Sequence, residues 1–109
     1  MKRVDKETLK SWLGQPGLFL MDVRSASAWN RSIAKIECSH RFAPEKFGKM
    51  LQDIPKNKKL VLYCEDGKTV SPILIQKLEK MGFTNLNLLE GGFQTWKGKE
   101  FPAVPKEVE

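Results

Sequence analysis

Cys64 is the side chain in this sequence most clearly placed to do chemistry. It directly follows the apolar run Leu60–Tyr63, and a short polar segment separates it from a second apolar segment that begins at Val70. The first run is typical of a buried strand and the second segment of a helix. In open parallel sheets, ligands bind beyond the carboxyl ends of the strands, where loops lead into helices. Cys64 is therefore expected at a ligand-binding position.

The residues after Cys64 favour a curled loop whose backbone N–H groups turn inward. Gly67 permits dihedral angles that other residues avoid, and Thr69 or Ser71 is expected to cap the helix that follows. Inward N–H groups and the positive end of a helix dipole stabilise an anion. Such a setting favours a reactive, anionic sulfur on Cys64. The alternative, a structural cysteine buried at a strand end, remains open.

Strand-like and helix-like segments alternate along the chain, and together they are expected to position this loop. The segments typical of strands are Leu18–Met21, Lys59–Cys64 and Asn85–Leu89, with a further brief strand expected within Ile33–Cys38. The segments typical of helices are Asp5–Leu13, Ser25–Arg31, Pro44–Asp53, Val70–Met81 and Glu90–Trp96. Asp5 is expected to cap the first of these helices, and Ser25 or Ser27 the second. This alternation predicts an α/β fold, an open, mostly parallel sheet of about five strands with helices on both faces.

Length and composition indicate one domain over residues 1–109. The chain has 109 residues, of which 40% are hydrophobic, enough for a single core. Residues 102–109 are expected to form a loosely attached tail, because Pro102 and Pro105 interrupt regular pairing. No apolar run approaches the about 20 residues of a membrane span, and none follows the basic start as in a secretory signal. We therefore expect no membrane partner and a cytoplasmic location, or a periplasmic one if a leader has been removed.

The net charge of +6 invites a nucleic-acid interpretation, but its distribution argues against one. The basic residues are spread along the chain, and the one tight cluster, Lys56–Lys59, is typical of a solvated turn. Aromatic residues are not interleaved with the basic ones, as a stacking surface for bases requires. We expect no nucleic-acid partner.

Four stretches, taken in order and at their spacing, resemble the rhodanese-homology domain family, that is, single-domain rhodanese-like sulfurtransferases. The resemblance covers nearly the whole chain. It rests on Phe19–Arg24, Leu60–Thr69, Leu78–Leu88, and Leu89–Trp96 with Phe101-Pro102 after it. Each stretch alone is a weak signal, whereas the four together are specific.

The resemblance implies sulfur transfer through a persulfide on Cys64. In this family the loop cysteine takes sulfur from a small sulfane-sulfur donor and passes it to a thiol, a sulfur carrier or cyanide. The matching substrate- and persulfide-binding loop is Glu65, Asp66, Gly67, Lys68 and Thr69. The Thr69 hydroxyl would hydrogen-bond the sulfur. No metal or organic cofactor is expected, and the oligomeric state is not indicated.

Two departures from the family pattern bear on the substrate. Members that favour thiosulfate often carry basic residues just after the cysteine, where this chain has Glu65 and Asp66. Two carboxylates would repel the dianion by about 1 kcal/mol per close charge pair; the alternative is that both side chains point to solvent. The second departure is Asn30–Ile36, which lacks the glycines and proline of the family's Gly-His-Ile-Pro-Gly-Ala segment beside the loop.

Other interpretations remain beside the enzyme. The main alternative is a non-catalytic rhodanese-like binding or redox-sensing module. A phosphatase relative of this fold would need a longer loop ending in Arg, and no Arg occurs from Glu65 onward. Cys38 is expected at a core position, with a resolving role for an oxidised Cys64 or a metal site with His40 as weaker options. Asp22 is expected to pair with Arg24 or with loop amides.

Overall fold

A five-stranded, all-parallel sheet forms the centre of the molecule, as the sequence predicts. The computed structural model describes residues 1–106. The strand order is β1-β6-β5-β2-β4, and every neighbouring pair runs parallel. The strands are β1 (Lys2–Val4), β6 (Leu86–Leu89), β5 (Lys59–Tyr63), β2 (Leu18–Asp22) and β4 (Ser39–Arg41). β2 and β5 pair along their full length at the centre, which explains why their sequences are continuously apolar.

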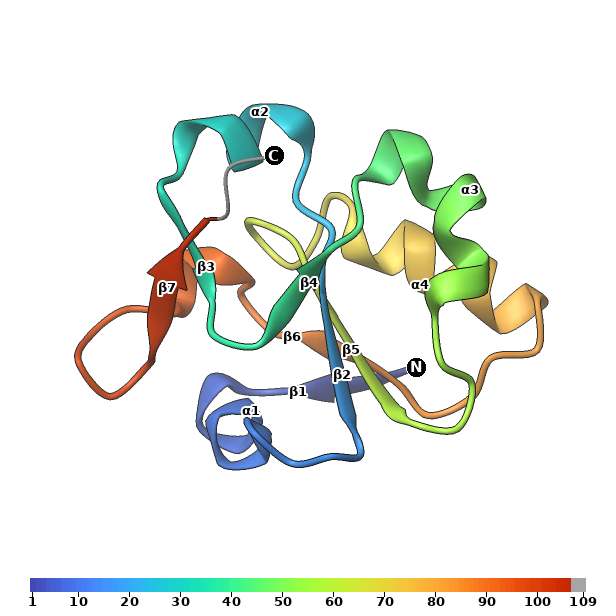
Figure 1. Ribbon diagram of the computed structural model, residues 1–109, viewed down its shortest axis with the longest axis horizontal. Coiled ribbons are helices and arrows are strands. Elements are labelled where there is room, and N and C mark those ends of the chain that lie inside the picture. Colours follow the sequence, from blue (N-terminus) through green and yellow to red (C-terminus); the bar gives the residue numbers. More distant parts are fainter. Residues whose placement is uncertain (107–109) are drawn as a thin grey trace.

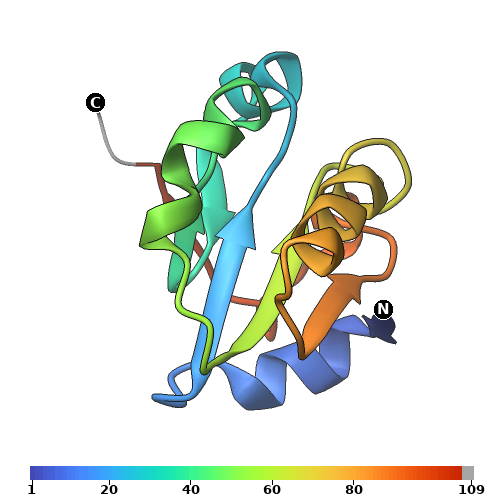
Figure 2. The ribbon, with the colours of Figure 1, turned by 90° about the vertical axis from the view of Figure 1, so that its right-hand side faces the viewer.

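Helices cover both faces of this sheet (Figures 1 and 2). One face carries α4 (Ser71–Lys80) and α3 (Phe47–Met50), which lies between two short 3₁₀ helices, Pro44–Lys46 and Leu51–Asp53. The other face carries α1 (Lys6–Trp12) and the short 3₁₀ helix Phe93–Thr95. Each face has its own buried apolar cluster, so the sheet separates two cores.

Two of the three expected helix caps form, and the third does not. The Asp5 side chain accepts a hydrogen bond from Thr8 N at the start of α1, and Ser25 does the same for Ala28 N at the start of α2 (Ala26–Arg31). At the start of α4, the capping residue is Val70, and no side chain caps the helix. The expectation of a Thr69 or Ser71 cap is therefore wrong, because the Thr69 hydroxyl donates to Asp66 and Ser71 is buried within the first turn.

Part of the expected tail forms a small second sheet. β7 (Ala103–Pro105) pairs antiparallel with β3 (Ala34–Ile36), which lies within the brief strand expected at 33–38. Prolines are compatible with an edge strand because one side of such a strand needs no N–H donors. The backbone N–H of Lys106 extends the pairing by donating to Ile33 O. The predicted loose attachment thus does not describe residues 103–106, and residues 107–109 lie outside the described part of the chain.

None of the helices within residues 1–106 combines the length and the apolar character that crossing a membrane requires.

A buried polar network joins the carboxyl ends of β2 and β5. Arg24 donates to Asp22 through Nε and Nη2, at 3.0 and 2.8 Å from Oδ2, and both residues are fully buried. The Tyr63 hydroxyl donates to Asp22 at 2.8 Å and accepts from Ile36 N at 3.1 Å. Burial, together with the Asp22 charge, raises the pKa of Tyr63 far above its usual value, so the hydroxyl remains a donor. The expected pairing of Asp22 with Arg24 is confirmed.

This network makes the fold sensitive to loss of the Asp22 charge. We expect Asp22→Asn to lower the free energy of unfolding by about 3–5 kcal/mol, because the buried Arg24 then lacks its counter-ion. Tyr63→Phe, which removes only one hydroxyl, should cost about 1–3 kcal/mol. Urea denaturation measures both. The exposed Asp53→Asn is the control and should change stability by less than about 0.5 kcal/mol. A loss below about 1 kcal/mol for Asp22→Asn would contradict this account.

Candidate active site

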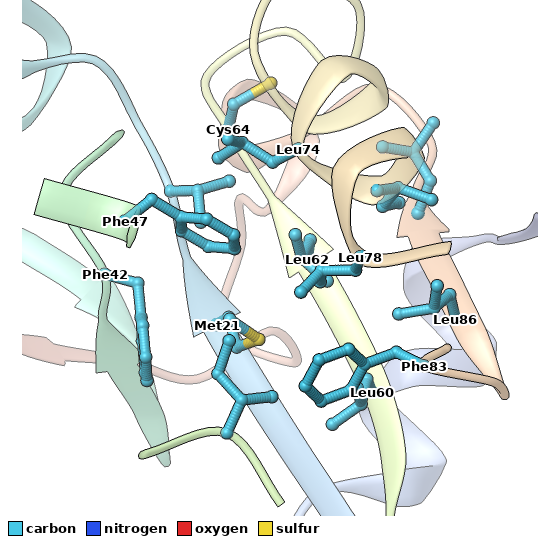
Figure 3. Packing of buried hydrophobic residues seen from close by; sticks show 14 residues of the cluster. Met21, Phe42, Phe47, Leu60, Leu62, Cys64, Leu74, Leu78, Phe83 and Leu86 are labelled. Carbon is cyan, nitrogen blue, oxygen red and sulfur yellow. The ribbon is translucent and has the colours of Figure 1, made fainter. Parts of the chain in front are cut away.

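Cys64 lies at the carboxyl end of β5 on the side of the sheet that α4 covers. Side chains alternate along this strand, so Leu60, Leu62 and Cys64 belong to the cluster under α3 and α4. Figure 3 shows Cys64 at one end of this cluster, with its sulfur directed away from the other labelled side chains. The residue is only 1% exposed. The strand thus directs the side chain beneath the loop rather than into solvent.

The loop after Cys64 is held from behind by the turn that follows β6. Phe93 N donates to Cys64 O at 2.9 Å, and Gln94 N donates to Glu65 O at 3.0 Å. Gly92 adopts a φ of +63°, and a Cβ there would lie 2.5 Å from Cys64 O. Gly67 also has a positive φ, and a Cβ there would lie 2.9 Å from Gly91 N. Two backbone segments thus touch with no side chain between them, which requires glycine at both places.

The Asp66 carboxylate folds back onto its own loop and remains partly exposed to solvent. Its Oδ1 accepts hydrogen bonds from the backbone N–H of Lys68 at 2.8 Å and of Thr69 at 3.0 Å. The same oxygen lies 3.6 Å from Cys64 Sγ, which donates to it. The Thr69 hydroxyl donates to Oδ2. Asp66 is therefore bound to the loop through its carboxylate, at a partly exposed position.

These donors strongly favour the charged form of Asp66. The Thr69 hydroxyl and then the backbone N–H groups of Lys68 and Thr69 hold the pKa of Asp66 far below its usual value. The loop therefore carries a bound negative charge at every physiological pH. The backbone N–H groups of Lys68 and Thr69 thus bind a carboxylate of the chain itself.

A small cavity lies beside the loop at the end of α2. Its volume is about 220 Å³, and its lining consists of Ala28, Arg31, Ser32, Glu65 and Phe93. Glu65 thus faces this cavity, whereas Asp66 faces the thiol. Despite its departure from the family pattern, the segment 30–36 still forms a wall beside the loop. Arg31 and Phe93 were not among the residues predicted for the site, because neither adjoins Cys64 in sequence.

Cys38 is not the core residue that the sequence suggested. It is exposed, in the turn between β3 and β4, with a φ of +70°. The register aligns Ser39 with Leu20 and Val61, so Cys38 lies about four residues lower than Cys64 and two strands away. At about 3.3 Å per residue and 4.8 Å per strand, this separation far exceeds the roughly 7 Å limit between the Cα atoms of a disulfide. Cys38 therefore cannot resolve Cys64 within this fold.

A larger cavity lies at the β4 edge of the sheet, and it does not contain the candidate site. It measures about 650 Å³ and is lined by Cys38 and His40 among others, with the His40 ring stacked on Phe19. None of the loop residues after Cys64 lines it. Among the described residues, no group of three His, Cys, Asp or Glu side chains is placed to hold a metal ion.

Comparison with known proteins identifies the family. A sequence profile of the rhodanese-like domain matches residues 5–99, so the chain belongs to the rhodanese-like domain family. No curated protein matches the sequence closely enough to be informative.

Solved structures share this fold at low sequence identity. A full-length protein from Lactobacillus plantarum is 20% identical, with a TM-score of 0.83 over 95% of this chain and 88% of that one. A rhodanese-like domain from Anabaena is 23% identical, with a TM-score of 0.80 over 97% and 80%. A thiosulfate sulfurtransferase from Pseudomonas aeruginosa is 20% identical, with a TM-score of 0.79; 95% of this chain matches only 19% of that one. At such identities the likeness establishes the fold alone.

The close backbone contact behind the loop predicts different costs for two glycine substitutions. Gly92 and Gly98 both have positive φ, but a Cβ meets loop backbone at 2.5 Å only at Gly92; at Gly98 its nearest neighbour is 3.7 Å away. Gly98→Ala should cost about 1–3 kcal/mol for backbone strain. Gly92→Ala should cost a further 1–3 kcal/mol or so from overpacking. Thermal and urea unfolding measure the difference, and equal costs would show that the contact does not constrain the loop.

Proposed function

We propose that this chain is a sulfurtransferase that carries sulfane sulfur as a persulfide on Cys64. Membership of the rhodanese-like family supports the class, and one structural neighbour is named a thiosulfate sulfurtransferase. The observation that carries the proposal is the loop itself. Its backbone N–H groups at Lys68 and Thr69 already hold an anionic oxygen 3.6 Å from Cys64 Sγ. A loop that binds an anion at that point has the donors a persulfide anion needs.

The reaction has two displacement steps at sulfur. The Cys64 thiolate attacks the outer sulfur of the donor, a new S–S bond forms, and the donor's own S–S bond breaks with its electron pair on the leaving group. With thiosulfate the leaving group is sulfite. A thiol or another nucleophile then attacks the outer sulfur of the Cys64 persulfide, which returns the Cys64 thiolate. The loop donors stabilise the anionic outer sulfur between the steps, and no cofactor takes part.

The cavity beside the loop is the proposed approach for donor and acceptor. Glu65 and Phe93 line it, and the backbone of both residues contacts the loop or the turn behind it. Arg31 supplies a positive charge at the same cavity. Small sulfane-sulfur donors and thiol acceptors fit a space of about 220 Å³.

One observation favours the alternative of a non-catalytic binding or redox-sensing module. Cys64 is only 1% exposed, and the loop donors are occupied by Asp66. A resting enzyme must therefore open slightly to admit a donor, whereas a binding module need not. The experiment that separates the two measures sulfur on Cys64 directly.

Incubation with thiosulfate or glutathione persulfide should add one sulfur atom, about 32 mass units, to the intact protein, located on Cys64. Cys64→Ser should abolish the addition, because no other thiol adjoins the loop donors. Cys38→Ser is the matched control and should load like the unmodified protein, since Cys38 lies at a distant turn. Intact-protein and peptide mass spectrometry measure both. If neither donor loads sulfur on Cys64, the result would contradict the sulfurtransferase function and favour the non-catalytic module.

A further inference from the structure

We propose that Asp66 is an internal occupant of the persulfide site, which leaves the loop donors when sulfur is loaded on Cys64 and thereby selects donors by charge. The part of this proposal that concerns donors rests on the proposed sulfurtransferase function. The part that concerns the position and charge of Asp66 rests on the loop geometry alone, and the two parts are testable separately.

Asp66 Oδ1 takes the position that an outer sulfur on Cys64 would need. One oxygen atom contacts two inward N–H groups and lies 3.6 Å from Cys64 Sγ. A sulfur atom bonded to Sγ and stabilised by the same two N–H groups must lie in the same place. An S–S bond is about 2 Å long, so an outer sulfur directed at these donors would fall well inside the contact distance of Oδ1. The carboxylate and the persulfide therefore exclude each other.

The negative charge of Asp66 opposes the approach of an anionic donor. Hydrogen bonds from Thr69 and Lys68 keep Asp66 ionised, so protonation does not release it at physiological pH. A donor must displace this carboxylate while its own charge approaches. Thiosulfate brings a sulfonate next to the transferred sulfur and is doubly charged. Glutathione persulfide has no sulfonate beside the transferred sulfur, so it meets less repulsion from Asp66.

Asp66 differs from its acidic neighbour Glu65 in where its side chain lies. Glu65 carries the same charge one residue earlier, but its side chain lines the cavity beside α2 and accepts no hydrogen bond from the loop in the described structure. Both residues repel an anion at long range, whereas Asp66 alone occupies the donors. Glu65→Gln is therefore a matched control for charge without occupancy.

Loading rates with two donors test the proposal on donor choice. Single-turnover formation of the Cys64 persulfide is followed by mass spectrometry with thiosulfate and with glutathione persulfide, all in a Cys38→Ser background. Asp66→Asn and Asp66→Ala should raise the thiosulfate rate relative to the glutathione persulfide rate by about tenfold. Glu65→Gln removes the same charge without freeing the loop donors, and it should raise this ratio less than either Asp66 variant does. An unchanged ratio in both Asp66 variants would overturn the proposal while leaving the sulfurtransferase function intact.

Alkylation of Cys64 tests the effect of the Asp66 charge without sulfur transfer. Iodoacetate and iodoacetamide are nearly equal in size, but only iodoacetate is anionic. With each reagent the Cys64 thiolate displaces iodide and forms a thioether. We expect Asp66→Asn to raise the iodoacetate rate relative to the iodoacetamide rate severalfold, and Glu65→Gln to raise it less. Equal acceleration of both reagents would mean that the substitution only loosens the loop, and it would overturn the proposal. A shifted alkylation ratio without persulfide on any variant would sustain the role of Asp66 and remove the sulfurtransferase function.

Discussion

Side chains along β5 alternate between the two faces of the sheet, and the rest of the molecule depends on this alternation. Leu60, Leu62 and Cys64 lie in the cluster under α3 and α4, whereas Val61 and Tyr63 lie in the opposite cluster. A shift of one residue would exchange the two sets. The thiol would then lie on the face of α1, away from the helix whose start the loop forms. The position of Cys64 is thus fixed by the same constraint that builds both cores.

The two neighbouring residues at the end of β5, Tyr63 and Cys64, fix this strand end through different groups. Tyr63 connects through its hydroxyl to Asp22 and to the backbone of β3, so it anchors the strand end to the rest of the sheet. The carbonyl oxygen of Cys64 accepts a hydrogen bond from Phe93 N, so the backbone beneath the loop is also fixed. Arg24 lies 4.2 Å from the centre of the Phe93 ring and joins the two sets of contacts. Both anchors therefore hold the backbone at the base of the loop.

The central elements follow from the sequence because their signals are local. Continuous apolar runs predicted β2 and β5, and short polar side chains at helix starts predicted the caps at Asp5 and Ser25. β1, β4 and β7 have three residues each, too few for a period, and they form because a neighbouring strand offers its edge. Cys38 was misplaced because a left-handed turn reverses the chain there. The direction of Asp66 depends on the fold of its own loop, which residue types alone do not reveal.

The loop donors raise a problem that any persulfide site must solve when it is empty. The backbone N–H groups of Lys68 and Thr69 need a hydrogen-bond acceptor, and they lie at an exposed part of the loop. Water is one solution, and a side chain of the loop is another. In this chain Asp66 satisfies the N–H groups of Lys68 and Thr69, so it stabilises the resting loop. In the proposed sulfurtransferase, the same hydrogen bonds would oppose each loading step, because they would have to break before sulfur takes their place. The residue type at position 66 would then set loop stability and donor preference together.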